Sequence, residues 1–244
     1  MKQILIFFLL VVLFFSCQKK SSNSLVVNLK CEHLINPIGI DSKNPRFSWH
    51  LVSKMNGIAQ EAFQIILGTD SLFTVESQIW DSGKIDLDKN LAVYHGPALK
   101  PFTRYFWGVQ LWDNQGTHSI SEISTFETGL MNISNWKGSW ITDTRDINLK
   151  AAPYFRKEFK PHKKILSARA YVAVAGLYEL FINGNKIGNH RLDPMYTRFD
   201  RRTLYVTHDV TAFINNEENT IGILLGNGWY NHQSTAVWYF DKAP

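Results

Sequence analysis

The sequence has few cysteines and lacks the short motifs of nucleotide-binding and zinc-binding proteins. Two cysteines in 244 residues are too few for a disulfide-stapled scaffold or for a zinc site built from paired CxxC motifs. Neither GxGxxG nor GxxxxGK[ST] occurs in the chain, which argues against nucleotide binding by those loops. Charged residues make up only 19% and apolar residues 45%, so we expect a packed core and not a disordered tail.

Aromatic residues are abundant, and turn residues recur at short intervals. Phe, Tyr and Trp reach 14% of the chain, and such residues favour half-buried pleated strands over helices. The strongest helical candidate is short, residues 70–76 with Asp70 as an N-cap. Closely spaced strands with few helices predict an all-β protein built from sandwiches. The turn signals between the strands include Asn36-Pro37, Asn44-Pro45, Asn56-Gly57, Asn183-Gly184 and Asn227-Gly228.

The first sixteen residues have the composition of an export signal. Twelve unbroken apolar residues, 4–15, follow a short positive start; at about 1.5 Å per residue they cover about 18 Å, less than the roughly 30 Å of a bilayer core. This length predicts a signal peptide and not a membrane-spanning helix. Ser16-Cys17 is the arrangement that a lipoprotein signal peptidase needs, so we predict a signal peptide over 1–16, lipidation of Cys17 and a polar tether over 17–24. The alternative is ordinary secretion with Cys17 incidental.

Residues 25–130 are predicted to form a first sandwich. Apolar residues alternate from Leu99 to Val109 before a polar turn, so one face of this strand is expected to pack against a core. The pattern resembles a fibronectin type III-like module, in which Tyr105 would close a tyrosine corner and Trp49 would be the core tryptophan. We interpret the aromatic ladder as core packing and not as a sugar platform, and Cys31 as a small core residue and not a reactive thiol.

Residues 136–244 are predicted to form a second sandwich, truncated at its C-terminus. Trp136 and Trp140 flank a glycine in a short link, which indicates a packed hinge that holds the two domains at a fixed angle. Alternating apolar residues run up to Asn183-Gly184, the signal of a type I′ hairpin. The last strand-like segment, 237–240, ends four residues before the terminus.

The order of motifs along the second half resembles a known family. The motifs are WxGxWI, AxxYVAxAGLYELFINGxxIG, LDPxYTxFxxR and NTIGxxLGNGWY. In this combination they resemble the N-terminal region of bacterial α-L-rhamnosidases of glycoside hydrolase family 78, over essentially all residues after the tether. The resemblance implies a fibronectin type III- or immunoglobulin-like sandwich followed by a galactose-binding-like jelly-roll sandwich. It also implies that the catalytic carboxylates belong to an (α/α)6 barrel that this chain lacks.

No catalytic residues are predicted. An inverting glycosidase needs two carboxyls about 6.5–9.5 Å apart, one as acid and one as base. The carboxylates near the family motifs are Glu179, Asp193, Asp200 and Asp209, and their sequence positions do not indicate such a pair. The chain alone is therefore expected to be inactive, as a truncated gene product, part of a split reading frame or a degenerate paralogue.

Polar and aromatic residues in two loops of the second domain are the candidate carbohydrate-binding site. Sugars bind through aromatic faces that meet apolar C–H patches, with a few polar groups on the hydroxyls. The alternative is that these loops pack against the catalytic barrel. The candidate residues are Tyr196, Arg198, Asp200, Asn227, Trp229, Tyr230 and Asn231.

No metal or other cofactor is expected. The carbohydrate-binding modules of related rhamnosidases hold calcium and L-rhamnose with an Asp-Asn pair near a hairpin. The corresponding stretch here, Ile182-Asn183-Gly184, lacks the Asp. A hard cation prefers several oxygen ligands with carboxylate among them.

The expected partners are rhamnose-containing oligo- or polysaccharides, the catalytic barrel of the same protein, and a membrane reached through the lipid anchor. A basic run from Arg156 to Arg169 could attract nucleic acid, but lysines beside strands commonly keep sheet edges soluble, and no nucleic-acid partner is predicted. The expected location is that of an exported lipoprotein, in the bacterial periplasm or at the cell surface and anchored in the outer membrane. Three functions stay open: an accessory region of an anchored α-L-rhamnosidase, a stand-alone glycan-binding lipoprotein, or a purely architectural pair of sandwiches.

Overall fold

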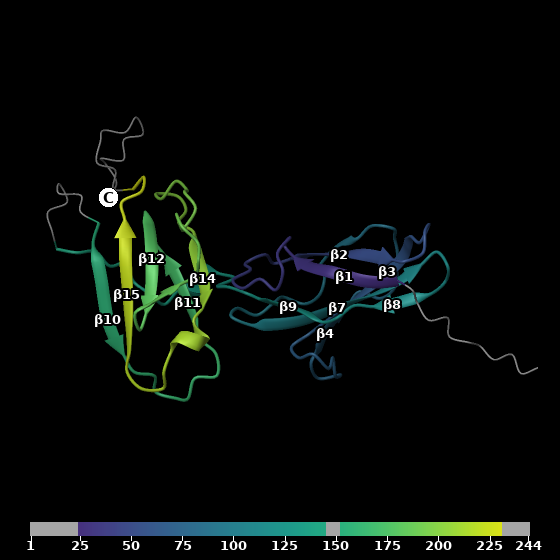
Figure 1. The fold of residues 1–244 in the computed structure, drawn as a ribbon, viewed down its shortest axis with the longest axis horizontal. Coiled ribbons are helices and arrows are strands. Elements are labelled where there is room, and N and C mark those ends of the chain that lie inside the picture. The colour runs from purple at the N-terminus through teal and green to yellow at the C-terminus, as the bar shows by residue number, and fades with distance from the viewer. Residues whose placement is uncertain (1–23, 145–151, 231–244) are drawn as a thin grey trace, which may run out of the picture.

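The computed structural model describes residues 24–144 and 152–230. These residues form two β-sandwiches, which lie side by side along the long axis of the molecule (Figure 1). The fold is all-β, as predicted. Helical residues in the described ranges are confined to two short 3-10 turns, η1 (Ile133–Asn135) and η3 (Thr211–Phe213).

The first sandwich packs a three-stranded sheet against a larger sheet. The smaller sheet has the order β1-β2-β6. In the larger sheet β4, β3, β7 and β8 are neighbours in that order, with β5 paired to β3 and β9 paired to β7. The bounds are β1 (Ser24–Cys31), β2 (Arg46–Ser53), β3 (Gln60–Gly68), β4 (Gln78–Asp81), β5 (Ile85–Asp86), β6 (Leu91–Val93), β7 (Arg104–Asp113), β8 (His118–Ile120) and β9 (Ser124–Glu127).

The second sandwich packs a four-stranded sheet against a two-stranded sheet. The four-stranded sheet has the order β10-β15-β12-β13, and the smaller sheet is β11-β14. Every neighbouring pair in these two sheets is antiparallel. The bounds are β10 (Tyr154–Phe159), β11 (Arg169–Ala173), β12 (Leu177–Ile182), β13 (Asn185–Ile187), β14 (Tyr205–Asp209) and β15 (Asn219–Gly226).

The core of the first sandwich follows the alternation seen in the sequence. Along β7, Tyr105, Trp107, Val109 and Leu111 are all buried, because successive side chains of a strand point to opposite faces of the sheet. The Tyr105 hydroxyl accepts a hydrogen bond from the Lys100 N–H at 2.8 Å. A bond from this hydroxyl back to the chain a few residues upstream is the defining contact of a tyrosine corner, so the predicted corner is confirmed.

Trp49 and Cys31 are core residues, as predicted. Trp49 is 0% exposed, and its Nε1–H donates to Gln60 Oε1 at 2.9 Å, so its single polar atom is satisfied. Cys31 is 1% exposed, and burial together with the nearby charge of Glu32 raises the pKa of its thiol to about 12. Because the thiolate is the reactive form of cysteine, this thiol is inert at neutral pH.

The predicted helix over residues 70–76 is wrong. The Asp70 carboxylate accepts hydrogen bonds from the N–H groups of Leu72 at 2.8 Å and Phe73 at 3.0 Å, and from the Ser77 hydroxyl at 2.9 Å. These bonds fold the segment into a loop in which Phe73 has a φ of 48°, a left-handed conformation that a right-handed helix excludes. An aspartate that bonds to nearby N–H groups stabilises a turn as well as a helix start, so the local sequence does not distinguish the two.

The hairpin between β12 and β13 has the turn that its sequence predicts. Asn183 has a φ of 51° and Gly184 a φ of 80°, and positive φ at both central residues defines the type I′ turn. Across this hairpin Leu180 pairs with Ile187, and both side chains are buried in the core between the two sheets.

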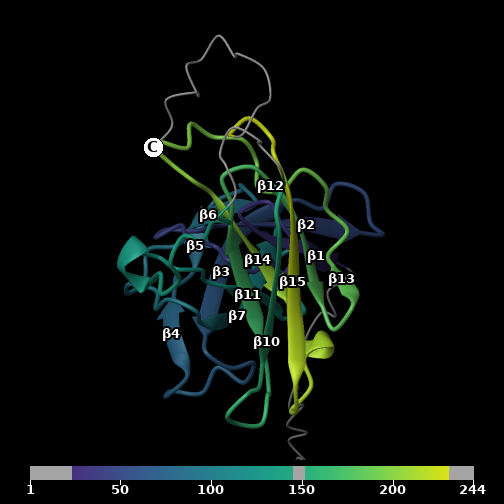
Figure 2. The same cartoon turned by 90° about the vertical axis from the view of Figure 1, so that its left-hand side faces the viewer.

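The outward face of β11 and β14 packs against the first sandwich. The ring of Tyr171 lies 5.3 Å from that of Phe102, edge to face. The Tyr205 hydroxyl donates to Asp41 Oδ2 at 2.7 Å and accepts from the Leu130 N–H at 3.1 Å. Figures 1 and 2 agree that β11 and β14 lie between the four-stranded sheet and the first sandwich. The two domains therefore share a hydrogen-bonded interface.

A largely buried ion pair crosses the same interface. Arg169 Nε and Nη2 donate to the two carboxylate oxygens of Glu127, each at 2.7 Å, and the two side chains are only 11% and 13% exposed. Arg169 Nη1 also lies 2.8 Å from Asp209 Oδ1 on β14. A bidentate pair of this kind fixes orientation as well as distance, so it holds the two sandwiches at a defined angle.

The link between the domains contributes one of its two tryptophans to this interface. The Trp136 ring lies 6.3 Å from that of Tyr205, whereas Trp140 stays 69% exposed. Trp136 directly follows η1, and its N–H bonds to the Ile133 carbonyl, which turns the chain back toward the interface. The predicted packed hinge is therefore made by Trp136 and not by Trp140.

Candidate functional site

Aromatic rings from two loops of the second sandwich form a continuous group, which we call the aromatic cluster: Tyr196, Phe199, Trp229 and Tyr230. The Tyr196 ring lies 5.7 Å from Phe199 and 6.1 Å from Trp229. Phe199 in turn lies 5.7 Å from Tyr230. The structure thus brings together three predicted site residues, which come from the loop between β13 and β14 and from the segment after β15.

Two rings of the aromatic cluster are open to solvent. Tyr196 and Trp229 are each 51% exposed, so each has surface available to the apolar C–H face of a sugar. Their contacts with neighbouring rings restrain them, which lowers the entropy lost on binding. Phe199 is not among the predicted residues, although it joins the two loops. The sequence does carry a signal for Phe199, because it lies three residues after Tyr196 in a loop already rich in aromatic and polar residues.

Arg198 and Asp200 form an ion pair on the first of these loops. The Arg198 Nε donates to Asp200 Oδ1 at 2.8 Å, and Nη2 donates to Oδ2 at 2.9 Å. The Arg198 carbonyl accepts from the N–H groups of Arg201 and Arg202, each at 2.9 Å, which closes the loop into a turn. The two predicted residues are therefore together, and their charges neutralise each other.

A close approach of two glycines positions the segment after β15. Gly176 has a φ of 139°, and a Cβ there would lie 2.8 Å from the Gly226 carbonyl oxygen. Gly228 has a φ of 52°, and a Cβ there would lie 3.2 Å from the Gly176 Cα. These close approaches hold the backbone of Asn227 beside the start of β12. The Asn227 carbonyl oxygen would be 3.3 Å from a Cβ on Gly176. Larger residues at either glycine would push the segment away.

Two predicted residues, Asn231 and the lipidation residue Cys17, lie outside the described residues. The same holds for the strand-like segment 237–240. Within the described ranges no helix is long and apolar enough to cross a bilayer.

The carboxylates near the family motifs are engaged in structural contacts. Asp209 illustrates the electrostatics: burial acts to raise the pKa of its carboxyl, but hydrogen bonds from Thr211 and the charge of Arg169 hold the pKa below its ordinary value. A general acid needs a raised pKa, so Asp209 does not suit that role. Three of the four carboxylates form ion pairs, Glu179–Lys186, Asp200–Arg198 and Asp209–Arg169, and Asp193 Oδ2 lies 3.2 Å from His190 Nδ1.

The side chain of Asn183 is used by the fold. Its Nδ2 donates to the Phe213 carbonyl at 2.9 Å and to Asn219 Oδ1 at 2.8 Å. Its Oδ1 accepts from the Thr220 N–H at 2.8 Å. In the part of the chain that the structure describes, no three His, Cys, Asp or Glu side chains gather where they could hold a metal ion.

A histidine–tyrosine pair connects the two sheets of the second sandwich. Tyr178 Oη and His208 Nε2 are 2.7 Å apart. Burial lowers the pKa of His208 and raises the pKa of Tyr178, so both side chains are neutral at neutral pH. The pair therefore acts as a hydrogen-bonded contact between β12 and β14.

The fold and these surfaces define a class of protein: an immunoglobulin-like sandwich rigidly joined to a second sandwich that displays aromatic loops. Comparison with known families specifies the class further. Residues 26–132 match the Rha78A-like N-terminal immunoglobulin domain, and residues 163–242 match the α-L-rhamnosidase N-terminal domain. The chain belongs to the α-L-rhamnosidase family and corresponds to the N-terminal region of its members.

Individual relatives agree with this assignment. An α-L-rhamnosidase of Formosa agariphila is 35% identical over 91% of this chain and 26% of its own length, and one of Alteromonas sp. (strain LOR) is 32% identical over 91% and 26%. The solved α-L-rhamnosidase from Dictyoglumus thermophilum matches with a TM-score of 0.78 and 41% identity, over 84% of this chain and 25% of that one. That from Aspergillus terreus matches with a TM-score of 0.73 and 26% identity, over 85% and 24%. The chain thus spans about a quarter of the length of the relatives it matches.

Proposed function

We propose that this chain is the non-catalytic N-terminal part of a lipid-anchored α-L-rhamnosidase, and that its aromatic cluster contacts rhamnose-containing glycans. The geometry of the cluster is the observation that carries the proposal, because it presents two half-exposed rings, Tyr196 and Trp229, in mutual contact. The two matched domains and the relatives named α-L-rhamnosidases support it. The proposal assigns hydrolysis to the part of the relatives that this chain does not match.

In this proposal the rigid interface between the sandwiches has a mechanical role. The Arg169–Glu127 ion pair and the Tyr205 hydroxyl hold the second sandwich at a fixed angle to the first. The aromatic cluster is then presented at a defined distance from the first sandwich. A fixed presentation reduces the conformational freedom lost when a glycan binds.

Binding of a rhamnosyl oligosaccharide is expected to weaken by about tenfold, or about 1.4 kcal/mol, in Trp229→Ala. The substitution removes one of the two exposed ring surfaces of the cluster, and an aromatic surface of this kind contributes on that scale. Calorimetric titration with L-rhamnose and with rhamnosyl oligosaccharides measures the change. Trp140→Ala is the matched control, because Trp140 is also exposed but lies in the link between the domains. Equal binding by both variants would refute the assignment of the site.

The second part of the proposal is export and anchoring through Cys17 at the periplasmic or outer surface of a bacterial membrane. Expression with a radiolabelled or clickable fatty acid should label the wild-type protein. Cys17→Ser should abolish the label, while Cys31→Ser, which alters a buried thiol, should retain it. Label that persists in Cys17→Ser would show that the anchor is elsewhere or absent.

Two other functions make different predictions for the same titration. If the loops pack against the catalytic part of the enzyme, Trp229→Ala should leave sugar binding unchanged and weaken the association of the two parts. If the chain is purely architectural, no sugar should give heat with the wild-type protein. A stand-alone glycan-binding lipoprotein would bind sugar without any catalytic partner.

A further inference from the structure

The loop between β13 and β14, residues 188–204, is rich in arginine, and we call it the basic loop. Its charged residues are four arginines and two aspartates: Arg191, Arg198, Arg201, Arg202, Asp193 and Asp200. Four positive and two negative charges leave a formal charge of +2 when His190 is neutral. The same loop supplies Tyr196 and Phe199 to the aromatic cluster. Positive charge and exposed aromatic surface therefore belong to one segment of the chain.

Most of the guanidinium groups of the basic loop are not neutralised by a carboxylate. Arg198 is paired with Asp200 through two hydrogen bonds. Arg191, Arg201 and Arg202 are exposed, and within residues 24–144 and 152–230 none of them forms an ion pair. An external anion can therefore reach these three groups without displacing a carboxylate of the protein.

Hydrogen bonds hold Arg201 and Arg202 in a tight turn beside the aromatic cluster. The Arg198 carbonyl accepts from the N–H groups of both residues, each at 2.9 Å, and the Thr197 hydroxyl donates to the Arg202 carbonyl. Phe199, a ring of the aromatic cluster, lies inside this turn. The two arginines thus extend from the same turn that supports the rings.

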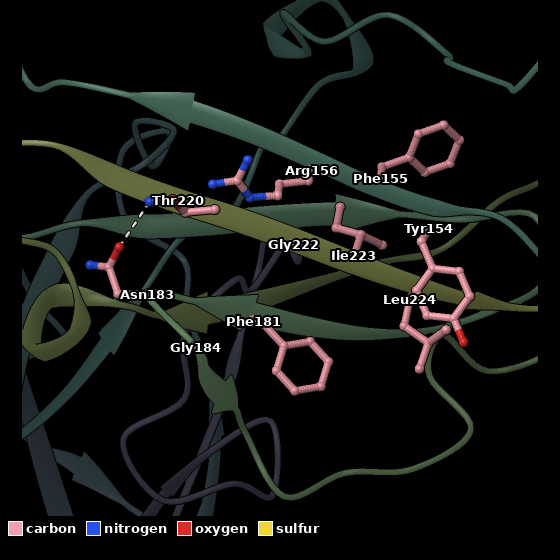
Figure 3. A pocket seen from close by; sticks show the side chains of 10 residues that line it. All are labelled: Tyr154, Phe155, Arg156, Phe181, Asn183, Gly184, Thr220, Gly222, Ile223 and Leu224. Atoms are coloured by element: carbon pink, nitrogen blue, oxygen red, sulfur yellow. Dashed lines mark hydrogen bonds between the residues drawn. The ribbon is translucent and has the colours of Figure 1, made fainter.

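The hollow over β10, β12 and β15 does not have this combination. Figure 3 shows that its lining is largely apolar, with Tyr154, Phe181 and Leu224 among the side chains. The one charged residue in the lining is Arg156, and its Nη2 donates to Glu158 Oε1 at 2.6 Å. The hollow therefore has no unpaired charge with which to orient a polar ligand, whereas the basic loop has both unpaired charge and exposed rings nearby.

The chemistry of the basic loop suits an anion attached to a sugar. A guanidinium presents its N–H donors in a planar fork, which fits the oxygens of a carboxylate or a tetrahedral oxyanion two at a time. A group of unpaired arginines also raises the local concentration of anions. The exposed rings of the aromatic cluster offer surface to the C–H face of a sugar. A negatively charged saccharide is the ligand that uses both features.

We propose that the aromatic cluster and the basic loop together bind an acidic saccharide, in which rhamnosyl units are joined to units that carry carboxylate or sulfate groups. Arg201 and Arg202 pair with the acidic group, and Tyr196 and Trp229 contact the faces of the sugar rings. This inference rests on the proposed function, that the aromatic cluster contacts rhamnose-containing glycans, and it adds the charge of the ligand.

Three ligands test whether charge is required, each titrated by calorimetry into the whole chain. They are an oligosaccharide of alternating rhamnose and uronic acid, the same oligosaccharide with its carboxylates reduced to alcohols, and a sulfated rhamnosyl oligosaccharide. An acidic ligand is expected to bind about tenfold more tightly than the reduced one at low salt. The advantage should disappear at about 1 M salt, where the screening length is about 3 Å.

The outcomes separate this inference from the proposed function. An advantage for only one of the acidic ligands supports the inference and identifies carboxylate or sulfate as the source of the charge. Equal binding of all three ligands would overturn the inference and leave the proposed function standing. Absence of binding by any of the three would overturn both.

Arg201→Gln combined with Arg202→Gln tests the assignment to the basic loop. This double variant should bind the acidic ligand about tenfold more weakly and the reduced ligand as the wild type does, because two exposed ion pairs to the ligand are lost. The matched control is Lys163→Gln combined with Lys164→Gln, which removes the same charge from exposed, unpaired residues in the loop between β10 and β11. Equal weakening in both double variants would show that only the net charge of the chain matters, and would overturn the site.

Two measurements guard against a purely structural effect. The unfolding midpoint of each variant shows whether it is folded, and if the arginine double variant is not, Arg201→Gln alone should weaken binding of the acidic ligand by about threefold. Trp229→Ala should weaken the acidic and the reduced ligand alike, because it acts on the sugar faces and not on the charge. If a folded arginine variant also loses both ligands alike, the arginines support the aromatic cluster and do not contact an acidic group, and the inference is wrong.

Discussion

Trp49→Ala is expected to lower the free energy of unfolding of the first sandwich by about 3–5 kcal/mol. The Trp49 ring is fully buried and lies 4.9 Å from Phe63. Its removal leaves a cavity between the two sheets, and it also leaves the Gln60 amide oxygen without its hydrogen bond from the indole. Chemical denaturation followed by intrinsic fluorescence and circular dichroism measures the loss.

Trp140→Ala is the control for this experiment, because it removes the same side chain from an exposed position. Its effect should stay within about 0.5 kcal/mol of zero. Comparable losses in the two variants would mean that Trp49 does not stabilise a sandwich core, and the assignment of the first domain would have to be revised.

Arg169→Ala is expected to release the second sandwich from the first, at a loss of about 3 kcal/mol or more of interface stability. The Glu127 carboxylate is 13% exposed and accepts both bonds of the Arg169 fork. Without the Arg169 guanidinium, the Glu127 carboxylate keeps its contact with Arg104. It stays largely buried, however, and part of its charge is no longer compensated. Calorimetry should then show the two domains unfolding separately, and proteases should cut the link faster.

Arg104→Ala is the matched control, since Arg104 bonds to the same carboxylate at 2.7 Å but is 51% exposed. An exposed pair contributes about 0–1 kcal/mol, so the domains should stay coupled in this variant. Equal loss of coupling in both variants, or none in Arg169→Ala, would show that the ion pair does not hold the interface.

The same carboxylate makes the interface sensitive to acid. Burial acts to raise the pKa of Glu127, but hydrogen bonds from Arg169 and Arg104 outweigh it and hold the pKa below the ordinary value of 4.5. A lowered pKa means that the pair stabilises the folded state above the unfolded pKa, and that this contribution is lost as the pH falls through the folded pKa. When the wild-type protein is acidified, calorimetry should therefore show the two domains unfolding in separate transitions. Arg169→Ala should show the same separation at neutral pH.

Where local chemistry decides structure, the sequence was a sufficient guide. The alternation from Leu99 to Val109, which includes Tyr105 and Trp107, predicts a buried face because the period of a strand is two residues. Asn183-Gly184 predicts its own turn because only such residues adopt two positive φ values in succession at low cost. The segment after Asp70 shows the limit, because the same carboxylate can begin a helix or close a loop, and here its bond from the Ser77 hydroxyl belongs to the loop.

The candidate sugar site was predictable in composition but not in arrangement. Tyr196, Trp229 and Tyr230 stand out as aromatic residues in polar loops. Their assembly depends on Phe199, which touches both Tyr196 and Tyr230. No periodicity links residues in separate loops, so their contact follows from how the strands between them pair.

The amino-acid sequence by itself indicated the all-β class, the Asn183-Gly184 turn, the core positions of Trp49 and Tyr105 and the resemblance to α-L-rhamnosidases, because each of these follows from short-range patterns. Only the tertiary structure decided that the outward face of β11 and β14 packs against the first sandwich. The Arg169–Glu127 pair joins residues 42 apart in the chain, and the sheet register sets Gly222 between Arg156 and Phe181. Such neighbours are set by strand pairing and domain packing, and these are global properties that no local pattern encodes.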